Sequence, residues 1–160
     1  MQSKTIHHDA CLFLEGTWVG KGTFGDSLVY DEEIEVKKIK PNIFYYQQNT
    51  KDPQAGVNHS ESGYFRIFME ESGKEGKVEL VLSHSFGACE VSEGTLTDKE
   101  ISLKVISSSL TSSAIQPYAA KMTRKYVLKD EDTISFIMDL DTKTGADSEH
   151  VEGELKRVKK

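Results

Sequence analysis

The 160-residue sequence predicts an all-β protein, a single closed antiparallel up-and-down β-barrel of about ten strands. Apolar and polar residues alternate with a period of two through most of the chain, and turn-forming residues separate the alternating segments at regular spacing. No helical pattern of about 10–15 residues intervenes, so a βαβ fold is not expected. Closing the sheet on itself would leave no exposed edge strand.

A short helical turn is expected around Asp9 to Leu14, before the first strand. That strand opens with Gly16-Thr17-Trp18, and its indole can plug one end of a barrel beneath an arginine from the last strands. Arg124 and Arg157 are both candidates for this cation–π partner. The expected strands are residues 16–24, 28–39, 43–51, 57–70, 77–84, 88–96, 100–107, 120–129, 132–141 and 148–158.

Several strands show one apolar face clearly, and turn residues follow them.

A segment near Ser108 to Tyr118 is ambiguous between a loop and a frayed strand end. We find no internal repeat and no linker, so we expect one domain over residues 1–160. The clearest apolar faces are Ile34 and Val36; Val78, Leu80 and Leu82; Ile101, Leu103 and Val105; and Ile134, Phe136, Met138 and Leu140.

A barrel of about ten strands is wider than side chains alone readily fill, which predicts a ligand cavity. A two-sheet sandwich is the alternative that the pattern alone leaves open. The net charge of −6 and the pI near 5.4 disfavour nucleic acid and anionic membranes as partners. The sequence has no apolar run of about 18 residues and no signal-peptide core at Met1, so we expect a cytoplasmic protein in which Cys11 and Cys89 are reduced.

Three histidines are candidates for function, because imidazole is the commonest metal and haem-iron ligand. His84 ends an apolar strand, where a hydrogen-bonded polar residue at a barrel rim is the simpler interpretation. His59 and His150 can each be a ligand or a surface histidine on composition alone. A hydrolase triad of Ser60, His59 and Glu61 is disfavoured, because neighbouring strand residues point to opposite faces. The sequence also lacks the hydrolase nucleophile elbow, the zinc-protease helix motif and the Cys-x-x-Cys motif.

Read together, several segments resemble nitrobindin, a haem-binding β-barrel family of the calycin, fatty-acid-binding-protein-like type. They occur in family order and cover nearly the whole chain. The most specific is His59-Ser60-Glu61-Ser62-Gly63-Tyr64-Phe65-Arg66. The others are residues 14–22, 30–34, 46–50, 87–91, Gly94-Thr95, Arg124-Lys125-Tyr126, and His150 followed by Leu155-Lys156-Arg157.

The resemblance implies a ferric haem b protein that binds nitric oxide and isomerises peroxynitrite to nitrate. His150 matches the family's proximal iron ligand on the last strand, and His59 matches a histidine that lines the distal side. Both are therefore the expected catalytic residues, and His150 is the expected metal ligand. Met138 and Leu140 share a strand face and are expected to contribute the apolar wall around the cofactor.

The alternative is a carrier of a fatty acid or another small hydrophobic molecule, which uses the cavity without iron. Such a carrier needs a buried arginine to meet the carboxylate of its ligand. Arg66 and Arg124 are available for this role in the sequence. Haem binding discriminates between the two functions.

Overall fold

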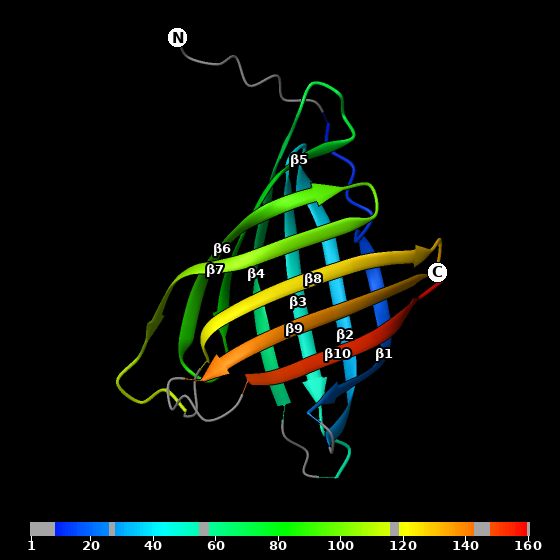
Figure 1. Ribbon diagram of the computed structural model, residues 1–160. Coiled ribbons are helices and arrows are strands. Elements are labelled where there is room, and N and C mark those ends of the chain that lie inside the picture. The colour runs from blue at the N-terminus through cyan, green and yellow to red at the C-terminus, as the bar shows by residue number, and fades with distance from the viewer. Residues whose placement is uncertain (1–8, 26–27, 55–57, 116–118, 143–147, 160) are drawn as a thin grey trace.

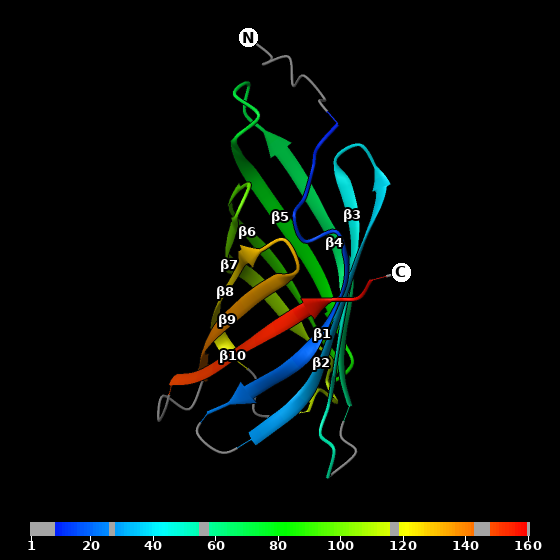
Figure 2. The same cartoon turned by 90° about the vertical axis from the view of Figure 1, so that its right-hand side faces the viewer.

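The alternating segments form ten antiparallel strands that pair in chain order and close on themselves, because β1 pairs with both β2 and β10 (Figures 1 and 2). This computed structural model describes residues 9–25, 28–54, 58–115, 119–142 and 148–159. The strands are β1 (Gly16–Phe24), β2 (Leu28–Lys40), β3 (Ile43–Lys51), β4 (Asn58–Met69), β5 (Glu75–His84), β6 (Ala88–Thr97), β7 (Glu100–Leu110), β8 (Ala119–Asp130), β9 (Thr133–Thr142) and β10 (Ser148–Arg157).

The structure confirms the predicted barrel and its ten strands, and excludes the sandwich. The ambiguous segment after residue 107 continues β7 as far as Leu110. No helix is found among the described residues, so none of them forms a helix that could cross a membrane.

The expected helical turn around Asp9 to Leu14 is wrong. Residues 12–15 make a single turn, in which the Glu15 N–H donates to the Leu12 carbonyl at 3.0 Å. Side chains from the barrel bind the last carbonyls of this segment, just before β1 begins. Arg157 Nη1 donates to the Glu15 carbonyl at 2.8 Å, and the Trp18 indole N–H donates to the Leu14 carbonyl at 2.9 Å.

One end of the barrel is closed by Trp18, which is fully buried. The Arg157 guanidinium lies 4.1 Å from the centroid of the indole ring, so Arg157 rather than Arg124 is the cation–π partner. The N-terminal segment covers this end, with Leu12 and Leu14 buried in the core. We call this the closed end.

The interior changes from apolar to polar along the barrel. Apolar side chains from all sides pack near Trp18. Further along, the inward positions hold a group of buried polar side chains, which are Glu32, Gln48, Glu61, His84, Glu90 and Arg124. The histidine end, opposite the closed end, is where β4 and β10 begin and β5 ends; it carries His59, His84 and His150 (Figure 1).

Candidate functional site

The polar group inside the barrel arises because charged residues occupy strand positions that otherwise hold apolar ones. Glu32 stands between the inward residues Tyr30 and Ile34 on β2, and Arg124 stands between Met122 and Tyr126 on β8. Side chains two apart on a strand point to the same face. These charges are therefore built into the interior by the same alternation that forms the core.

Arg124 is the centre of the polar group, and two carboxylates share its guanidinium. Its Nη1 and Nη2 donate to Glu61 Oε1 and Oε2 at 2.5 and 2.9 Å. Its Nε and Nη2 donate to Glu90 Oε1 at 3.1 and 2.7 Å. The bidentate geometry is the strong form of an arginine–carboxylate pair. All three side chains are at most 4% exposed, so the pair is shielded from water.

Burial and charge act on these groups in opposite directions. Burial by itself would raise the pKa of Glu61, but the positive charge of Arg124 overcomes it and holds that pKa well below its usual range. Burial would likewise lower the pKa of Arg124, while Glu61 and Glu90 raise it. The interior thus holds a permanent cation fixed between carboxylates.

A chain of neutral hydrogen-bonding groups extends from this network to β2. The hydroxyls of Tyr46 and Tyr126 are 2.8 Å apart, Tyr46 donates to the Gln48 carbonyl oxygen, and Gln48 donates to Glu32. Burial raises the pKa of Tyr126 to about 12. Burial also raises the pKa of Glu32 to about 8, partly offset by the hydrogen bond from Gln48. Glu32 is therefore mainly protonated at neutral pH.

His84 and His59 lie on the solvent side of the Arg124 network. His84 is buried, with Nδ1 at 3.2 Å from Glu61 Oε2 and Nε2 at 3.2 Å from Glu90 Oε2. His59 faces inward from β4 and its side chain is 32% exposed; its Nε2 is 3.3 Å from His84 Nδ1 and 3.6 Å from Glu61 Oε2. The Phe86 ring contacts both imidazoles, with centroids 5.2 and 5.0 Å away. His59 thus connects the interior network to solvent.

His150 lies on the other face of the wall. Alternation on β10 turns Val151 and Leu155 inward and leaves His150 outward and exposed. Its Nδ1 is 2.7 Å from Asp139 Oδ1, and its Nε2 is 3.1 Å from Glu152 Oε2. The carboxylates of Asp139 and Glu152 accept these hydrogen bonds and raise the pKa of His150 above its ordinary value, with Asp139 having the larger effect.

The structure therefore brings some of the predicted site residues together and leaves His150 apart from them. Met138 is buried beside the Arg124 network, with its sulfur 3.7 Å from Arg124 Nη1. Leu140 shares the inward face of β9 and packs partly buried against the core. His59 belongs to the same interior group through Glu61. Ser60 points away from it and donates to Asn49 at 2.7 Å, which agrees with the argument against a triad.

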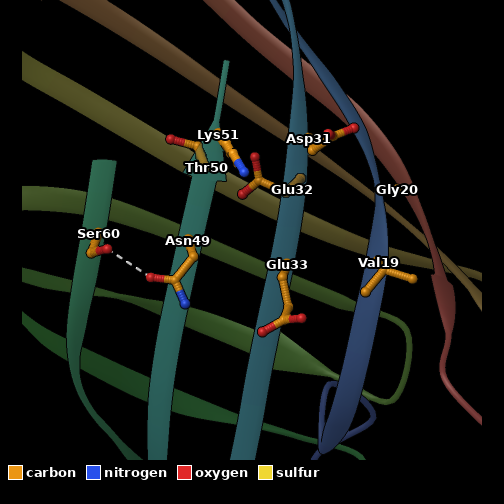
Figure 3. A pocket seen from close by; sticks show the side chains of 9 residues that line it. All are labelled: Val19, Gly20, Asp31, Glu32, Glu33, Asn49, Thr50, Lys51 and Ser60. Carbon is orange, nitrogen blue, oxygen red and sulfur yellow. Dashed lines mark hydrogen bonds between the residues drawn. The ribbon is translucent and has the colours of Figure 1, made fainter. Parts of the chain in front are cut away.

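A cleft of about 510 Å³ lies along β1–β4 (Figure 3). Most of its lining side chains belong to outward strand positions, and the Ser60–Asn49 hydrogen bond forms part of its wall. None of the three histidines lines it. The ligand cavity expected inside the barrel therefore stays a prediction. The lining residues are Val19, Gly20, Asp31, Glu32, Glu33, Asn49, Thr50, Lys51 and Ser60.

Neither arginine proposed for a fatty-acid carrier is available to a ligand carboxylate. Both edges of the Arg124 guanidinium are held by Glu61 and Glu90. Arg66 is exposed, and its Nη1 donates to Glu79 at 2.7 Å. This arrangement disfavours the carrier alternative.

The sequence interpretation missed the interior ion network and the part that His84 plays in it. The position of His84 at the end of a strand was predicted correctly, but the partners of His84, Glu61 and Glu90, come from two other strands. One signal was available: Glu32, Glu90 and Arg124 all occupy inward positions in strands whose other inward residues are apolar or small. Charged residues at such positions indicate a polar interior.

The fold and the site together define a closed antiparallel barrel with a buried polar group in its interior. Residues 8–157 match the family model described as a THAP4-like, heme-binding beta-barrel domain. The chain belongs to this haem-binding family, and its predicted resemblance to nitrobindin is confirmed.

Known relatives extend along most of the chain. It is 32% identical to an Arabidopsis thaliana protein named "Peroxynitrite isomerase Rv2717c", over 91% of this chain and 86% of that protein. It is 27% identical to the rat "Peroxynitrite isomerase THAP4" over 89% of its length, but spans only 26% of that longer protein. The crystal structure of Rv2717c from M. tuberculosis superposes with a TM-score of 0.73 at 28% identity, covering 92% of this chain and 94% of that one.

The histidine end has donor groups that suit a haem. His150 is an accessible imidazole whose Nδ1 is bonded to a carboxylate, and a carboxylate partner of this kind orients metal-bound histidines and raises their basicity. Because Nδ1 faces Asp139, Nε2 is the nitrogen left for iron, and the exposed Glu152 can move aside. On the inner face, Met138 belongs to the apolar core and Leu140 packs against it, so both offer apolar surface.

Proposed function

We propose that this chain is a haem-dependent peroxynitrite isomerase, with ferric haem b as its cofactor and nitric oxide as a second ligand of the iron. The membership of the chain in a haem-binding barrel family carries this proposal. Relatives that are named peroxynitrite isomerase match most of the length of this chain, and they support the isomerisation of peroxynitrite as its reaction. Bound haem would supply an iron centre at which peroxynitrite rearranges to nitrate.

His150 would be the residue that holds the iron of the bound haem. Asp139 fixes the orientation of the imidazole ring through Nδ1, and this leaves Nε2 as the nitrogen that would bind the iron. The proton and the iron compete for the same nitrogen, so the raised pKa of His150 makes ligation favourable only once that proton is lost. This role requires the ring to contact a haem bound at the histidine end.

His59 would act on the substrate side. It is the inward-facing imidazole that solvent reaches, and it can donate a hydrogen bond to an anionic oxygen of peroxynitrite. Met138 and Leu140 would exclude water from the same side. Exclusion of water favours rearrangement to nitrate over escape of reactive fragments.

The test is the decay of peroxynitrite in the presence of haem-loaded protein, followed by stopped-flow absorbance, with nitrate and nitrite measured at the end. We expect a rate that rises linearly with protein concentration and a product that is mainly nitrate. His59→Ala should keep haem but change the rate. A decay rate equal to that with haem-free protein would refute the proposed reaction.

A further inference from the structure

The side chains of His59, Glu61 and His84 point toward one another at the histidine end, between the Arg124 network and solvent. Each offers one ligand atom, and these are His59 Nε2, Glu61 Oε2 and His84 Nδ1. They come from two adjacent strands that pair directly, since Glu61 on β4 is the register partner of His84 on β5. The backbone ladder therefore fixes their mutual positions.

The three ligand atoms form a nearly regular triangle. The separations are 3.2 Å between His84 and Glu61, 3.3 Å between the two histidines, and 3.6 Å between His59 and Glu61. In a tetrahedral zinc site with bonds of about 2.0–2.1 Å, two ligand atoms lie about 3.3–3.4 Å apart. The triangle thus has the dimensions of one face of such a tetrahedron without rearrangement.

The surroundings of the triangle also suit a metal ion. His84 Nε2 faces Glu90 Oε2 at 3.2 Å, which is the carboxylate–histidine arrangement that orients a metal-bound imidazole. Arg124 holds Glu61 in a bidentate pair and fixes the direction of its carboxylate. The 32% exposure of the His59 side chain leaves a path for an ion to enter.

Charge provides an independent argument. Glu61 and Glu90 place two carboxylates around one guanidinium, with all three groups buried. Two carboxylates against one guanidinium give this ion group an excess of negative charge, and buried negative charge is costly unless a cation pairs with it. In the part of the chain that the structure describes, His84 Nε2 and Glu90 Oε2 also lack a hydrogen bond of good geometry. A cation at the triangle would balance this charge.

We propose that His59, Glu61 and His84 form a binding site for a divalent transition-metal ion, with Zn²⁺ as the ion that the two imidazoles and one carboxylate suit best. Three protein ligands leave the fourth tetrahedral position to water or an anion, as in zinc sites that keep an open position. Glu90 is the outer-shell partner.

The site is distinct from the proposed iron ligand His150, and the inference does not rest on the haem function. The experiment is a calorimetric titration of the purified, chelator-treated chain with ZnCl₂, with Co²⁺ absorption as a report of tetrahedral geometry. We expect one ion per chain. Glu90→Gln should weaken binding by about 10–100-fold, the range typical of outer-shell partners, and His59→Gln and His84→Gln by more.

The His84 side chain is buried, so His84→Gln can lose Zn²⁺ binding through misfolding. The His59 side chain is partly exposed, so His59→Gln tests the site with less effect on folding. The matched control is His150→Gln, which should leave Zn²⁺ affinity unchanged. Absence of stoichiometric Zn²⁺ binding by the wild-type chain would overturn the proposal. So would full affinity in either His59→Gln or His84→Gln, or a loss of affinity confined to His150→Gln.

Haem absorption in the same variants separates this proposal from the functional one. His84→Gln should lose Zn²⁺ yet keep the Soret band after reconstitution, whereas His150→Ala should lose the Soret band yet keep Zn²⁺. A failed haem reconstitution in the wild-type chain would leave the zinc result standing. If His84→Gln instead bound Zn²⁺ as wild type does, the zinc site would be refuted whatever the haem result.

Discussion

Glu32 provides a test of the polar interior through the dependence of stability on pH. The side chain is 3% exposed and faces inward from β2. Its Oε1 accepts a hydrogen bond from Gln48, and among the described residues its Oε2 has no hydrogen-bond partner. Burial is the main cause that raises its pKa from 4.5 to about 8. The carboxyl therefore keeps its proton in the folded protein over a range in which the unfolded chain loses it.

Between these two pKa values the folded state binds one more proton than the unfolded state, so the free energy of unfolding falls as pH rises. The shift of the pKa from 4.5 to about 8 lowers the free energy of unfolding, relative to its value at low pH, by about 5 kcal/mol at high pH. At pH 7 the loss is roughly 3 kcal/mol. Glu32→Gln has a similar shape, can accept the hydrogen bond from Gln48 and never ionises. Its stability relative to wild type should therefore rise by about 2.5 kcal/mol between about pH 5 and pH 7.

Urea unfolding at several pH values, followed by the fluorescence of the single tryptophan, Trp18, measures this difference. Glu33→Gln is the matched control, because Glu33 is the next residue and points outward to solvent. A difference between Glu32→Gln and wild type that does not change with pH would show that the buried carboxyl does not hold its proton. An equal effect in Glu33→Gln would also contradict the assignment to Glu32.

Three further predictions concern stability and the environment of His150. Arg124→Leu leaves two buried carboxylates without their cation and should destabilise the protein by about 3–5 kcal/mol in urea unfolding; a loss below about 1 kcal/mol contradicts the network. Arg157→Ala removes the cation over Trp18 and should cost about 1–2 kcal/mol with a shift of the tryptophan emission, and unchanged emission contradicts this. The hydrogen bond that His150 donates to Asp139 raises the pKa of His150, so the contribution of this bond to stability is present at low pH and is lost as pH rises through that pKa. In an NMR titration, Asp139→Asn should move the pKa of His150 down toward 6.5; an unmoved pKa would exclude Asp139 as the cause.

The barrel could be predicted because its strands and turns are determined by residues that are close together in the sequence. Period-two alternation is set by the pleat of each strand, and the turns are set by residues such as Pro41-Asn42 between β2 and β3. The cation–π contact of an arginine with Trp18 at one end of the barrel was predicted, but the sequence left two arginines, Arg124 and Arg157, as equal candidates. Only the β1–β10 register, which pairs Trp18 with Arg157, decides between them.

The interior network could not be predicted, because it joins side chains that are distant in sequence. Arg124, Glu61 and Glu90 come from three strands, and their contact depends on how the barrel closes. The hydrogen bond from Arg157 to the Glu15 carbonyl likewise joins residues from nearly opposite ends of the chain, so local sequence could not predict it. Alternation on β10 could have shown that His150 points outward, since Val151 and Leu155 are the apolar positions of that strand.

Ligation of haem iron by His150 is tested by a hemin titration of the wild-type chain and of His150→Ala, followed by the Soret band. We predict saturable binding of one haem per chain in wild type, and loss of the shifted Soret band in His150→Ala. His59→Ala should retain the haem with altered ligand-binding kinetics. Full retention of haem by His150→Ala, with loss in His59→Ala, would contradict the assignment and move the iron ligand to the inner face of the barrel.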